Sequence, residues 1–421
     1  MTVLNELIIA SKDGEWGKGE SFESSIEMLV IRGTDFEDVR VGTLDSVPIR
    51  HIAKRFAEYK SLQPYDIVIE TAGGSKDRPT GRTLFVSPSL IYKSELPLIC
   101  ASFARFIRIS PDLADPRYIF WLLQHMYDSG YMLKYHTQHT GVARFQWTTF
   151  ANNEQLNLPS LSIQRRIASI LSSYDDLIEN NIRRIKALEQ AAHDLYREWF
   201  VEFRFPRHES LPMVDSGTEY GMIPQGWEVG FLGDVAQDKR KNVQPSELEP
   251  DTPYVGLEHI PRKTIALSEW GMAGDVNSTK LVFEVGDILF AKIRPYLHKV
   301  AVAPVDGVSS SDAIIIVPKS LEFYSLVLMC VSDEHFVDYA TTTSQGTQMP
   351  RANWNVLAEY PVVIPPKELL DEFNEFVSDI INDIRTNIFR NTTLRETRDL
   401  LLPRLVSGEL DVSDIELGDL S

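Results

Sequence analysis

Two short segments of the chain place an arginine, amide side chains and a tryptophan at matching distances. One is GVARFQW, residues 141–147, and the other is GTQMPRANW, residues 346–354. Arginine can donate two parallel hydrogen bonds to guanine, and asparagine or glutamine can pair with adenine, so these side chains suit the edges of nucleic-acid bases. The candidate base-contacting residues are Arg144, Gln146, Gln348, Arg351 and Asn353.

Basic residues in two further loops are candidates for phosphate contacts. Such contacts position a protein on DNA without reading its sequence. Any one of these side chains could instead belong to a surface salt bridge. The candidates are Lys76, Arg78 and Arg82 in one half of the chain, and Lys292, Arg294 and Lys299 in the other.

The net charge of −18 over 421 residues opposes a phosphate-binding role at first sight. The distribution of charge weakens that objection. Residues 51–108 contain nine Lys and Arg against five Asp and Glu, whereas residues 401–421 contain one Arg against five acids. Acidic residues are therefore concentrated outside the candidate binding loops.

The usual motifs of an enzyme active site are missing from the sequence. The glycine-rich TAGGSKDRPTG has neither the spacing of a phosphate-binding loop nor that of a dinucleotide fingerprint. His136 and His139 have no cysteine partners, and Asp66 and Glu70 lack the third carboxylate and the lysine of a nuclease site. We therefore expect no catalytic residue, no metal site and no cofactor site in this chain.

Composition is typical of a soluble, folded protein of roughly three structural units. Cys100 and Cys330 both lie in apolar stretches, so a disulfide framework is not expected. The first residues lack the pattern of a signal peptide, and no stretch is long and apolar enough to span a bilayer. We expect a cytoplasmic protein with no membrane association.

The chain also repeats itself at a period of about 206 residues, which is close to the offset between the two glycine-to-tryptophan segments. KSLQPYDIVIETAGG, from Lys60, resembles LVFEVGDILFAKIRP, from Leu281, and LICASFARFIRIS corresponds to VSSSDAIIIVPKS. Each half continues through a predicted helix, the glycine-to-tryptophan loop and a proline. Two strand-rich domains on one plan are therefore expected.

Each half ends in a long helix, because apolar residues recur at three- and four-residue steps over residues 163–199 and 369–405. A helix of this length with one apolar stripe needs a partner, and we predict that the two pack as an antiparallel coiled coil. Asn181 and Asn387 occupy equivalent places in the stripes. They would either pair and fix the register or face solvent beside it.

The predicted fold is α+β, with two strand-rich domains, each followed by a long helix, and an internal pseudo-two-fold repeat. The predicted segments are a first recognition domain at 1–160, a central helical region at 161–203, a linker at 204–225, a second recognition domain at 226–366, a distal helical region at 367–406 and an acidic tail at 407–421.

The two long segments and the sequence IPQGWEVGFLGDVA carry a resemblance to a known family. LNLPSLSIQRRIASILSSYDDLIENNIRRIKALEQAAHDLYREWFVEF resembles the central conserved region of the Type I restriction-modification specificity subunits (HsdS), and VVIPPKELLDEFNEFVSDIINDIRTNIFRNTTLRETRDLLLPRLVSGEL resembles the distal one. IPQGWEVGFLGDVA resembles the family's entry into its second target-recognition domain. The first domain begins MTVLNELIIA, with no clear counterpart of that entry.

The resemblance implies a non-catalytic subunit in which each domain reads one half of a split, asymmetric target in double-stranded DNA. It implies two methyltransferase subunits, which would bring S-adenosylmethionine, and motor-nuclease subunits for cleavage. The alternatives are a nuclease or methyltransferase with a degenerate motif, and a helical scaffold that binds only proteins.

Overall fold

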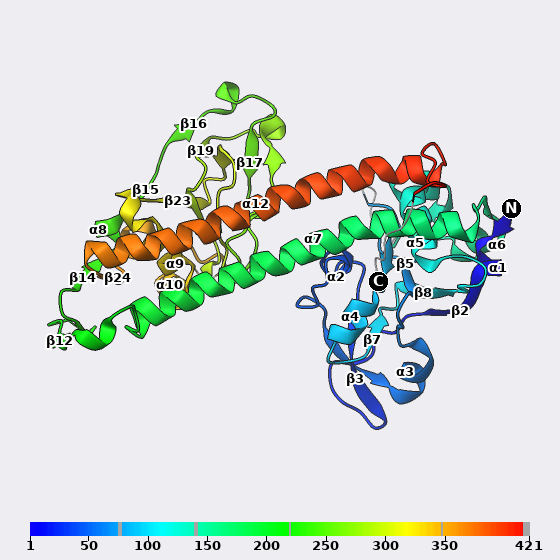
Figure 1. The fold of residues 1–421 in the computed structure, drawn as a ribbon, viewed down its shortest axis with the longest axis horizontal. Coiled ribbons are helices and arrows are strands. Elements are labelled where there is room, and N and C mark those ends of the chain that lie inside the picture. The colour runs from blue at the N-terminus through cyan, green and yellow to red at the C-terminus, as the bar shows by residue number, and fades with distance from the viewer. Residues whose placement is uncertain (75–77, 139–141, 219, 347, 416–421) are drawn as a thin grey trace. The chain divides into compact units, whose positions relative to one another are not determined.

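The chain forms two compact units, each containing a strand-rich domain and part of each of two long helices. The first unit comprises Met1–Asn180 with Thr393–Ser421, and the second comprises Asn181–Thr392. The computed structural model describes residues 1–74, 78–138, 142–218, 220–346 and 348–415 (Figure 1). The long helices are α7, Leu161–Tyr196, and α12, Lys367–Val406.

In the first unit, an antiparallel four-stranded sheet lies between two hydrophobic cores. Its strands run in the order β2, β8, β5, β6. Every residue of β5 is buried because alternate side chains face opposite cores: Ile67 and Ile69 pack with α5 and α7, and Val68 packs with a second sheet. The strands are β2 Ile8–Asp13, β5 Ile67–Glu70, β6 Thr83–Phe85 and β8 Ala104–Ile109.

The second sheet of this unit has the order β4, β3, β7, and its β3 and β7 are parallel. Four helices and a 3₁₀ turn pack against these sheets. Asp115 caps α5 by accepting a hydrogen bond from the Tyr118 amide at 3.0 Å, and Pro116 occupies the first helical position. The elements are β3 Ser25–Ile31, β4 Ile49–Ala53, β7 Leu98–Cys100, α2 Phe36–Arg40, α3 Lys54–Lys60, α4 Pro88–Lys93, α5 Pro116–Asp128 and η1 Tyr131–Tyr135.

The second unit repeats this plan with different residues. Its main sheet has the order β15, β23, β20, β21, and β20 again lies between two cores: Ile288 and Phe290 face one, and Leu289 and Ala291 face the other. In its second sheet, β17 and β22 form the parallel pair. The strands are β15 Ala236–Asp238, β16 Asn242–Val243, β17 Pro253–Val255, β18 Gly271–Met272, β19 Lys280–Phe283, β20 Ile288–Ala291, β21 Val300–Val302, β22 Gly307–Ser309 and β23 Ala313–Pro318.

Two consecutive helices, α9 (Tyr324–Ser332) and α10 (Glu334–Thr342), follow β23 in the second unit. All but the first residue of α9 are buried, because α9 lies within the core that also holds β20 and α12. The predicted α+β class and the internal repeat are confirmed. The two domains share the strand order of the main sheet and the position of the parallel strand pair. The sequence repeat alone does not give these relationships.

Each domain opens with a strand that pairs with the segment just before its long helix. β1 pairs antiparallel with β11, and β14 pairs antiparallel with β24. A one-turn helix follows each opening strand. In each helix a carboxylate accepts a hydrogen bond from the backbone amide of the residue that precedes the helix: Glu6 from Val3 at 3.1 Å, and Asp234 from Phe231 at 2.8 Å. The elements are β1 Thr2–Val3, α1 Leu4–Leu7, β11 Gln155–Leu156, β14 Glu228–Phe231, α8 Leu232–Val235 and β24 Pro361–Ile364.

This pairing corrects one expectation from the sequence. MTVLNELIIA is the structural counterpart of GWEVGFLGDVA, since both form a strand and a capped turn at the same place in their domains. The equivalence lies in backbone pairing and in the position of one acid. The two opening segments have few identical residues, so their equivalence is not evident from the sequence.

Within both units α7 and α12 pack along their apolar stripes and run antiparallel. In the first unit Ile167 and Leu171 share a core with Leu402 and Leu405. In the second unit, Asn181 contacts Asn391, and Trp199, just beyond the end of α7, contacts Phe373. Residues later in the first helix therefore meet residues earlier in α12, as antiparallel packing requires. The predicted coiled coil is confirmed, and α12 continues through Pro403.

Neither of the two arrangements expected for Asn181 and Asn387, a mutual pair or two solvent-facing side chains, is found. Asn181 donates from Nδ2 to Oδ1 of Asn391 at 2.8 Å. Asn387 is 1% exposed and donates instead to the backbone carbonyl of Asp383 within its own helix. In an antiparallel pair the axial level decides which residues meet, and Asn391 lies about one helical turn from the residue chosen by sequence equivalence.

The segment expected to be a linker contains regular structure. It contains a 3₁₀ turn, His208–Ser210, and a hairpin of β12, Met213–Asp215, and β13, Met222–Pro224. Before it, a short π-helical turn, Arg197–Val201, extends α7. Trp227 then packs against Phe200, Phe203 and Phe205. None of the described helices has the length and apolarity that crossing a membrane requires.

Candidate nucleic-acid interface

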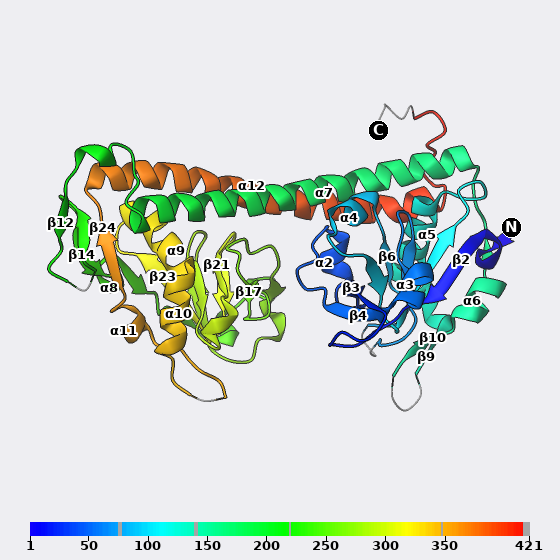
Figure 2. The same ribbon diagram turned by 90° about the horizontal axis from the view of Figure 1, so that it is seen from below.

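In the first unit, Arg144 lies on the middle of three adjoining backbone segments. After β5, the chain passes beside β10, Arg144–Phe145, where the Phe145 amide donates to the Thr71 carbonyl at 2.9 Å and the Gly73 amide donates to that of Ala143 at 3.1 Å. On its other side β10 pairs with β9, His136–Thr137 (Figure 2). Arg144 is exposed and Phe145 is buried beneath it, as alternation along a strand requires.

In the second unit, Arg351 occupies the corresponding position. The Arg294 amide donates to the Pro350 carbonyl and the Ala352 amide donates to that of Lys292, both at 2.8 Å. On the opposite side, Arg351 and Gln345 exchange two backbone hydrogen bonds of 2.9 and 3.1 Å. Arg351 is exposed and Ala352 is buried.

The two arginines therefore belong to the same backbone frame in their respective domains. Each is followed two residues later by the residue that precedes a short helix, Gln146 before α6 (Trp147–Asn153) and Asn353 before α11 (Trp354–Leu357). Asn353 caps its helix by accepting a hydrogen bond from the Asn355 amide at 3.0 Å, whereas Gln146 makes no such bond. The structure thus brings together, in each unit, an exposed arginine and an exposed amide side chain.

Other predicted contact residues differ in how freely their side chains are presented. The ammonium groups of Lys292 and Lys299 donate to the backbone carbonyls of Ser311 and Leu257. Burial, followed by the charge of Arg262, lowers the pKa of Lys299. Arg78, Arg294 and Gln348 are exposed, and Lys76 lies outside the described residues.

Arg82 corrects the predicted set, because it is a structural residue. It is 8% exposed, its guanidinium donates to both carboxylate oxygens of Glu70 at 2.9 and 3.0 Å, and it also donates to the Gly33 carbonyl at 2.6 Å. Asp66, which immediately precedes β5, is likewise buried and pairs with Arg108 at 2.7 Å. The acids and bases around β5 neutralise one another inside the domain, so neither Glu70 nor Arg82 is presented to phosphate.

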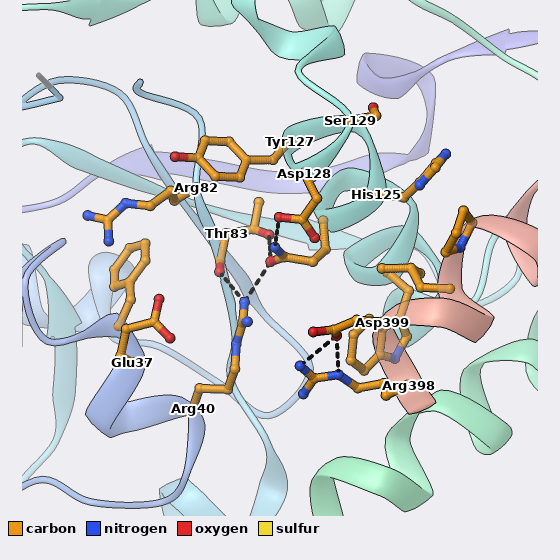
Figure 3. A pocket seen from close by; sticks show the side chains of 15 residues that line it. Glu37, Arg40, Arg82, Thr83, His125, Tyr127, Asp128, Ser129, Arg398 and Asp399 are labelled. Atoms are coloured by element: carbon orange, nitrogen blue, oxygen red, sulfur yellow. Dashed lines mark hydrogen bonds and ion pairs between the residues drawn. The ribbon is translucent and has the colours of Figure 1, made fainter. Parts of the chain in front are cut away.

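A polar pocket of about 570 Å³ in the first unit was not indicated by any sequence motif (Figure 3). It lies among α2, α5 and the end of α12. Arg40 donates there to the Thr83 carbonyl and to Gln124, whose amide group donates to Asp128 at 2.8 Å, and Arg398 pairs with Asp399. Because these groups come from segments far apart in sequence, neither spacing nor composition predicts their meeting.

Several of the pocket's charged groups already have partners within the protein. Arg398 also pairs with Asp175 of α7, and burial raises the pKa of both Asp128 and Asp175. The described residues contain no group of three or more His, Cys, Asp or Glu side chains arranged to hold a metal ion. We interpret the pocket as the polar packing of the helix pair against the domain.

Comparisons with known proteins place this architecture in a family context. A family model described as "Type I restriction modification DNA specificity domain" matches residues 75–190 and 224–391, one match in each repeat. The chain is 26% identical over 275 residues to the Type I restriction enzyme MjaIX specificity subunit of Methanocaldococcus jannaschii, and that match covers 62% of each protein. It is 25% identical over 403 residues to the HindI specificity subunit of Haemophilus influenzae, covering 80% of this chain and 85% of that one.

Among solved structures, the S subunit of the Type-I restriction-modification system from M. genitalium superposes with a TM-score of 0.55. The superposition covers 96% of this chain and 95% of that subunit, at 13% sequence identity. At this level of identity the likeness concerns the fold. The match to the MjaIX subunit spans about three fifths of that relative's length.

Proposed function

The chain belongs to the family of Type I restriction modification DNA specificity domains, and from this premise we propose that it is the non-catalytic DNA-recognition subunit of a Type I restriction-modification complex. Each strand-rich domain would read one half of a split, asymmetric target in double-stranded DNA. The observation that carries this proposal is the repeated frame that exposes Arg144 in one domain and Arg351 in the other. An exposed arginine fork beside an amide side chain suits base edges in a groove.

Two identical frames with different side chains favour two readers of different sequence. Arg144 has Thr71, Ala72 and Phe103 around it along the backbone, whereas Arg351 has Lys292, Ile293 and Asp312 in the equivalent places. Backbone geometry would set where each loop meets the duplex, and the side chains would set which bases are accepted. An asymmetric target is the expected result.

We propose that the helix pair sets the separation of the half-sites and docks the partner subunits. Leu177, Phe376 and Leu400 on these helices are 51%, 52% and 72% exposed, which leaves apolar surface for companion proteins to cover. We expect two methyltransferase subunits, which would bring S-adenosylmethionine, and motor-nuclease subunits for cleavage. Both cysteines are free and buried, consistent with our placing the protein in the cytoplasm.

A domain exchange tests the proposal. Residues 1–160 are replaced by the corresponding domain of another specificity subunit, and modified bases are sequenced in a host that carries the intact system. We expect one half of the methylated sequence to change and the other half to persist. An unchanged methylated sequence in an active complex rejects the two-reader proposal.

Three further experiments separate the alternatives. Lengthening α7 by one or two turns within residues 163–196 should lengthen the nonspecific spacer, since each added residue extends a helix by about 1.5 Å. Methylation or cleavage of DNA by the purified chain alone would favour an enzyme. Steeply salt-dependent binding of DNA by the assembled complex would argue against a scaffold that binds only proteins.

A further inference from the structure

A carboxylate lies beside the exposed arginine of the second unit. Asp312 is in the turn between β22 and β23, and its carbonyl accepts a hydrogen bond at 3.0 Å from the amide of Lys292, a residue next to the Arg351 segment. The Asp312 carboxylate is 3.7 Å from the guanidinium of Arg351. The chain fold therefore brings an acid and a base from segments about forty residues apart to one exposed edge.

The contact between these side chains is loose, and both remain accessible. Arg351 is 56% exposed and Asp312 is 35% exposed. A separation of 3.7 Å exceeds hydrogen-bonding distance, so the acceptor lone pairs and the donor N–H groups are not consumed by each other. The buried pair of Arg82 and Glu70 shows the contrast, because its two short bonds use both carboxylate oxygens.

A donor fork next to an acceptor matches one particular base-pair edge. In the major groove a G·C pair presents two acceptors on guanine, N7 and O6, followed by one donor on cytosine, the N4 amino group. An arginine fork can donate to both guanine atoms, and a neighbouring carboxylate can accept from the cytosine amino group. An A·T pair instead presents an acceptor, a donor and an acceptor, which places a thymine oxygen opposite the carboxylate.

We propose that Asp312 and Arg351 together read a single G·C base pair in the half-site bound by the second domain. Arg351 donates to guanine, and Asp312 accepts from the paired cytosine while excluding thymine by repulsion between acceptors. This inference rests on the proposed function, since it requires that the edge meets DNA.

The first domain lacks this pair at the equivalent positions. Phe103 replaces Asp312: its carbonyl accepts hydrogen bonds from the Thr71 and Ala72 amides, as that of Asp312 accepts from Lys292. Phe103 is 58% exposed and offers only an apolar contact, which suits the thymine methyl group rather than the cytosine amino group. The same frame therefore presents an acidic position in one domain and an apolar one in the other.

The segments LICASFARFIRIS and VSSSDAIIIVPKS contain Phe103 and Asp312, but aligned end to end they place Asp312 opposite Ser102. That alignment indicates the repeat but singles out neither residue. Only the structure shows that this turn adjoins the arginine loop.

The test uses the assembled complex of this chain with its methyltransferase subunits. Methylated sites are first determined for the wild-type chain, and binding is then measured to DNA in which one G·C pair of the second half-site at a time carries 7-deazaguanine or N4-methylcytosine. We expect one position where either substitution weakens binding, because the first removes an acceptor and the second blocks the amino group. These measurements leave the protein unaltered, so folding cannot confuse them.

Protein variants assign the position to the residues. Asp312→Ala should broaden that one position, with a loss of roughly ten- to a hundredfold in preference for G·C over other pairs. Arg351→Ala should weaken binding and relax the same position. The matched control is Glu228→Ala, which removes one negative charge from exposed β14, next to the start of α12, and should leave every position unchanged.

The outcomes separate this inference from the proposed function. If the complex binds and methylates a specific sequence but no G·C position responds to both DNA modifications, or Asp312→Ala leaves every position intact, the pair does not read that base pair. If the wild-type complex shows no sequence-specific DNA binding at all, the proposed function fails first.

Discussion

Asn181 of α7 and Asn391 of α12 form a side-chain hydrogen bond of 2.8 Å inside the apolar seam of the helix pair, within the second unit. Asn391 is 4% exposed and Asn181 is half-buried, so the bond is partly shielded from water. A polar pair at this depth stabilises one axial register, because sliding either helix by a turn would leave both amides without partners.

Asn391→Ala should lower the free energy of unfolding by about 1–3 kcal/mol, since it leaves the Asn181 amide without its acceptor and opens a small cavity. Urea unfolding of the full-length chain measures this. Arg184→Ala is the control, because the Arg184–Asp383 pair joins the same helices at the surface, with its side chains 54% and 51% exposed. The control should cost no more than about 0.5 kcal/mol. Equal losses in the two variants would contradict a special role for the buried amide.

The helix pair was predictable because an apolar stripe repeats over many turns of each helix. Which residue of α7 contacts which residue of α12 was not predictable. Asn387 has the same place in its stripe as Asn181, yet the antiparallel pairing brings Asn391 to that level. Equivalence in sequence describes a repeat, and contact depends on the direction and axial offset of two helices. Neither quantity is contained in the periodicity.

The residues of the candidate interface were likewise only partly predictable from the sequence. Arg144 and Arg351 were found from sequence because they precede tryptophans in a repeated loop, and both are exposed at matching backbone positions. Arg82 has the same residue type in a loop of the same charge, yet its guanidinium is buried against Glu70. Burial depends on which strands flank a residue, so residue type and local charge could not separate these arginines.

The stability of the second unit should depend on pH through Glu189, a residue of α7 that is 7% exposed. It accepts hydrogen bonds from the amides of Ile265 and Ala266 at 2.8 and 3.0 Å and from the Thr264 hydroxyl. Burial raises the pKa of Glu189 above its ordinary 4.5 despite these donors. Between the two values the folded state holds more protons than the unfolded state, so the free energy of unfolding falls as pH rises through this window.

Unfolding profiles of the wild type and Glu189→Gln, measured from about pH 4 to pH 7, reveal this contribution by difference. The wild type should lose stability relative to the variant as pH rises. Glu198 provides a control of opposite sign, because the hydrogen bond from Arg204 lowers the pKa of that exposed carboxyl. Relative to Glu198→Gln, the wild type should lose stability as pH falls. A Glu189 difference that grows in the same direction as the Glu198 difference would exclude the assigned pKa shift.

Arg82 and Arg144 should have separable effects although both were predicted to contact DNA. Arg82→Ala leaves Glu70 buried without its partner and should destabilise the chain by about 3–5 kcal/mol. Arg144→Ala removes an exposed side chain and should change stability by less than about 0.5 kcal/mol while weakening DNA binding by the complex. Thermal unfolding and DNA binding of each variant make the comparison.

A double variant distinguishes a structural Arg82 from a DNA-contacting one. Glu70→Leu with Arg82→Met replaces the whole buried pair with apolar groups of similar size, and much of the lost stability should return. DNA binding by the complex should return with it. A double variant that folds as stably as the wild type yet binds DNA poorly would restore Arg82 to the interface.

Asn353 combines a structural contact with a position at the candidate interface, and two substitutions separate these roles. Its side chain accepts a hydrogen bond from the Asn355 amide at 3.0 Å and so caps α11, while the residue itself is exposed. Asn353→Ala should cost about 1 kcal/mol through loss of the cap.

Asn353→Asp keeps a capping oxygen and should leave stability nearly unchanged, but its negative charge would repel phosphates. Binding by the complex should therefore weaken most at low salt. Gln146→Ala is the matched control, since Gln146 precedes α6 without capping it and its loss should not affect unfolding. If Asn353→Asp binds DNA as tightly as the wild type across a salt series, the start of α11 does not face the duplex.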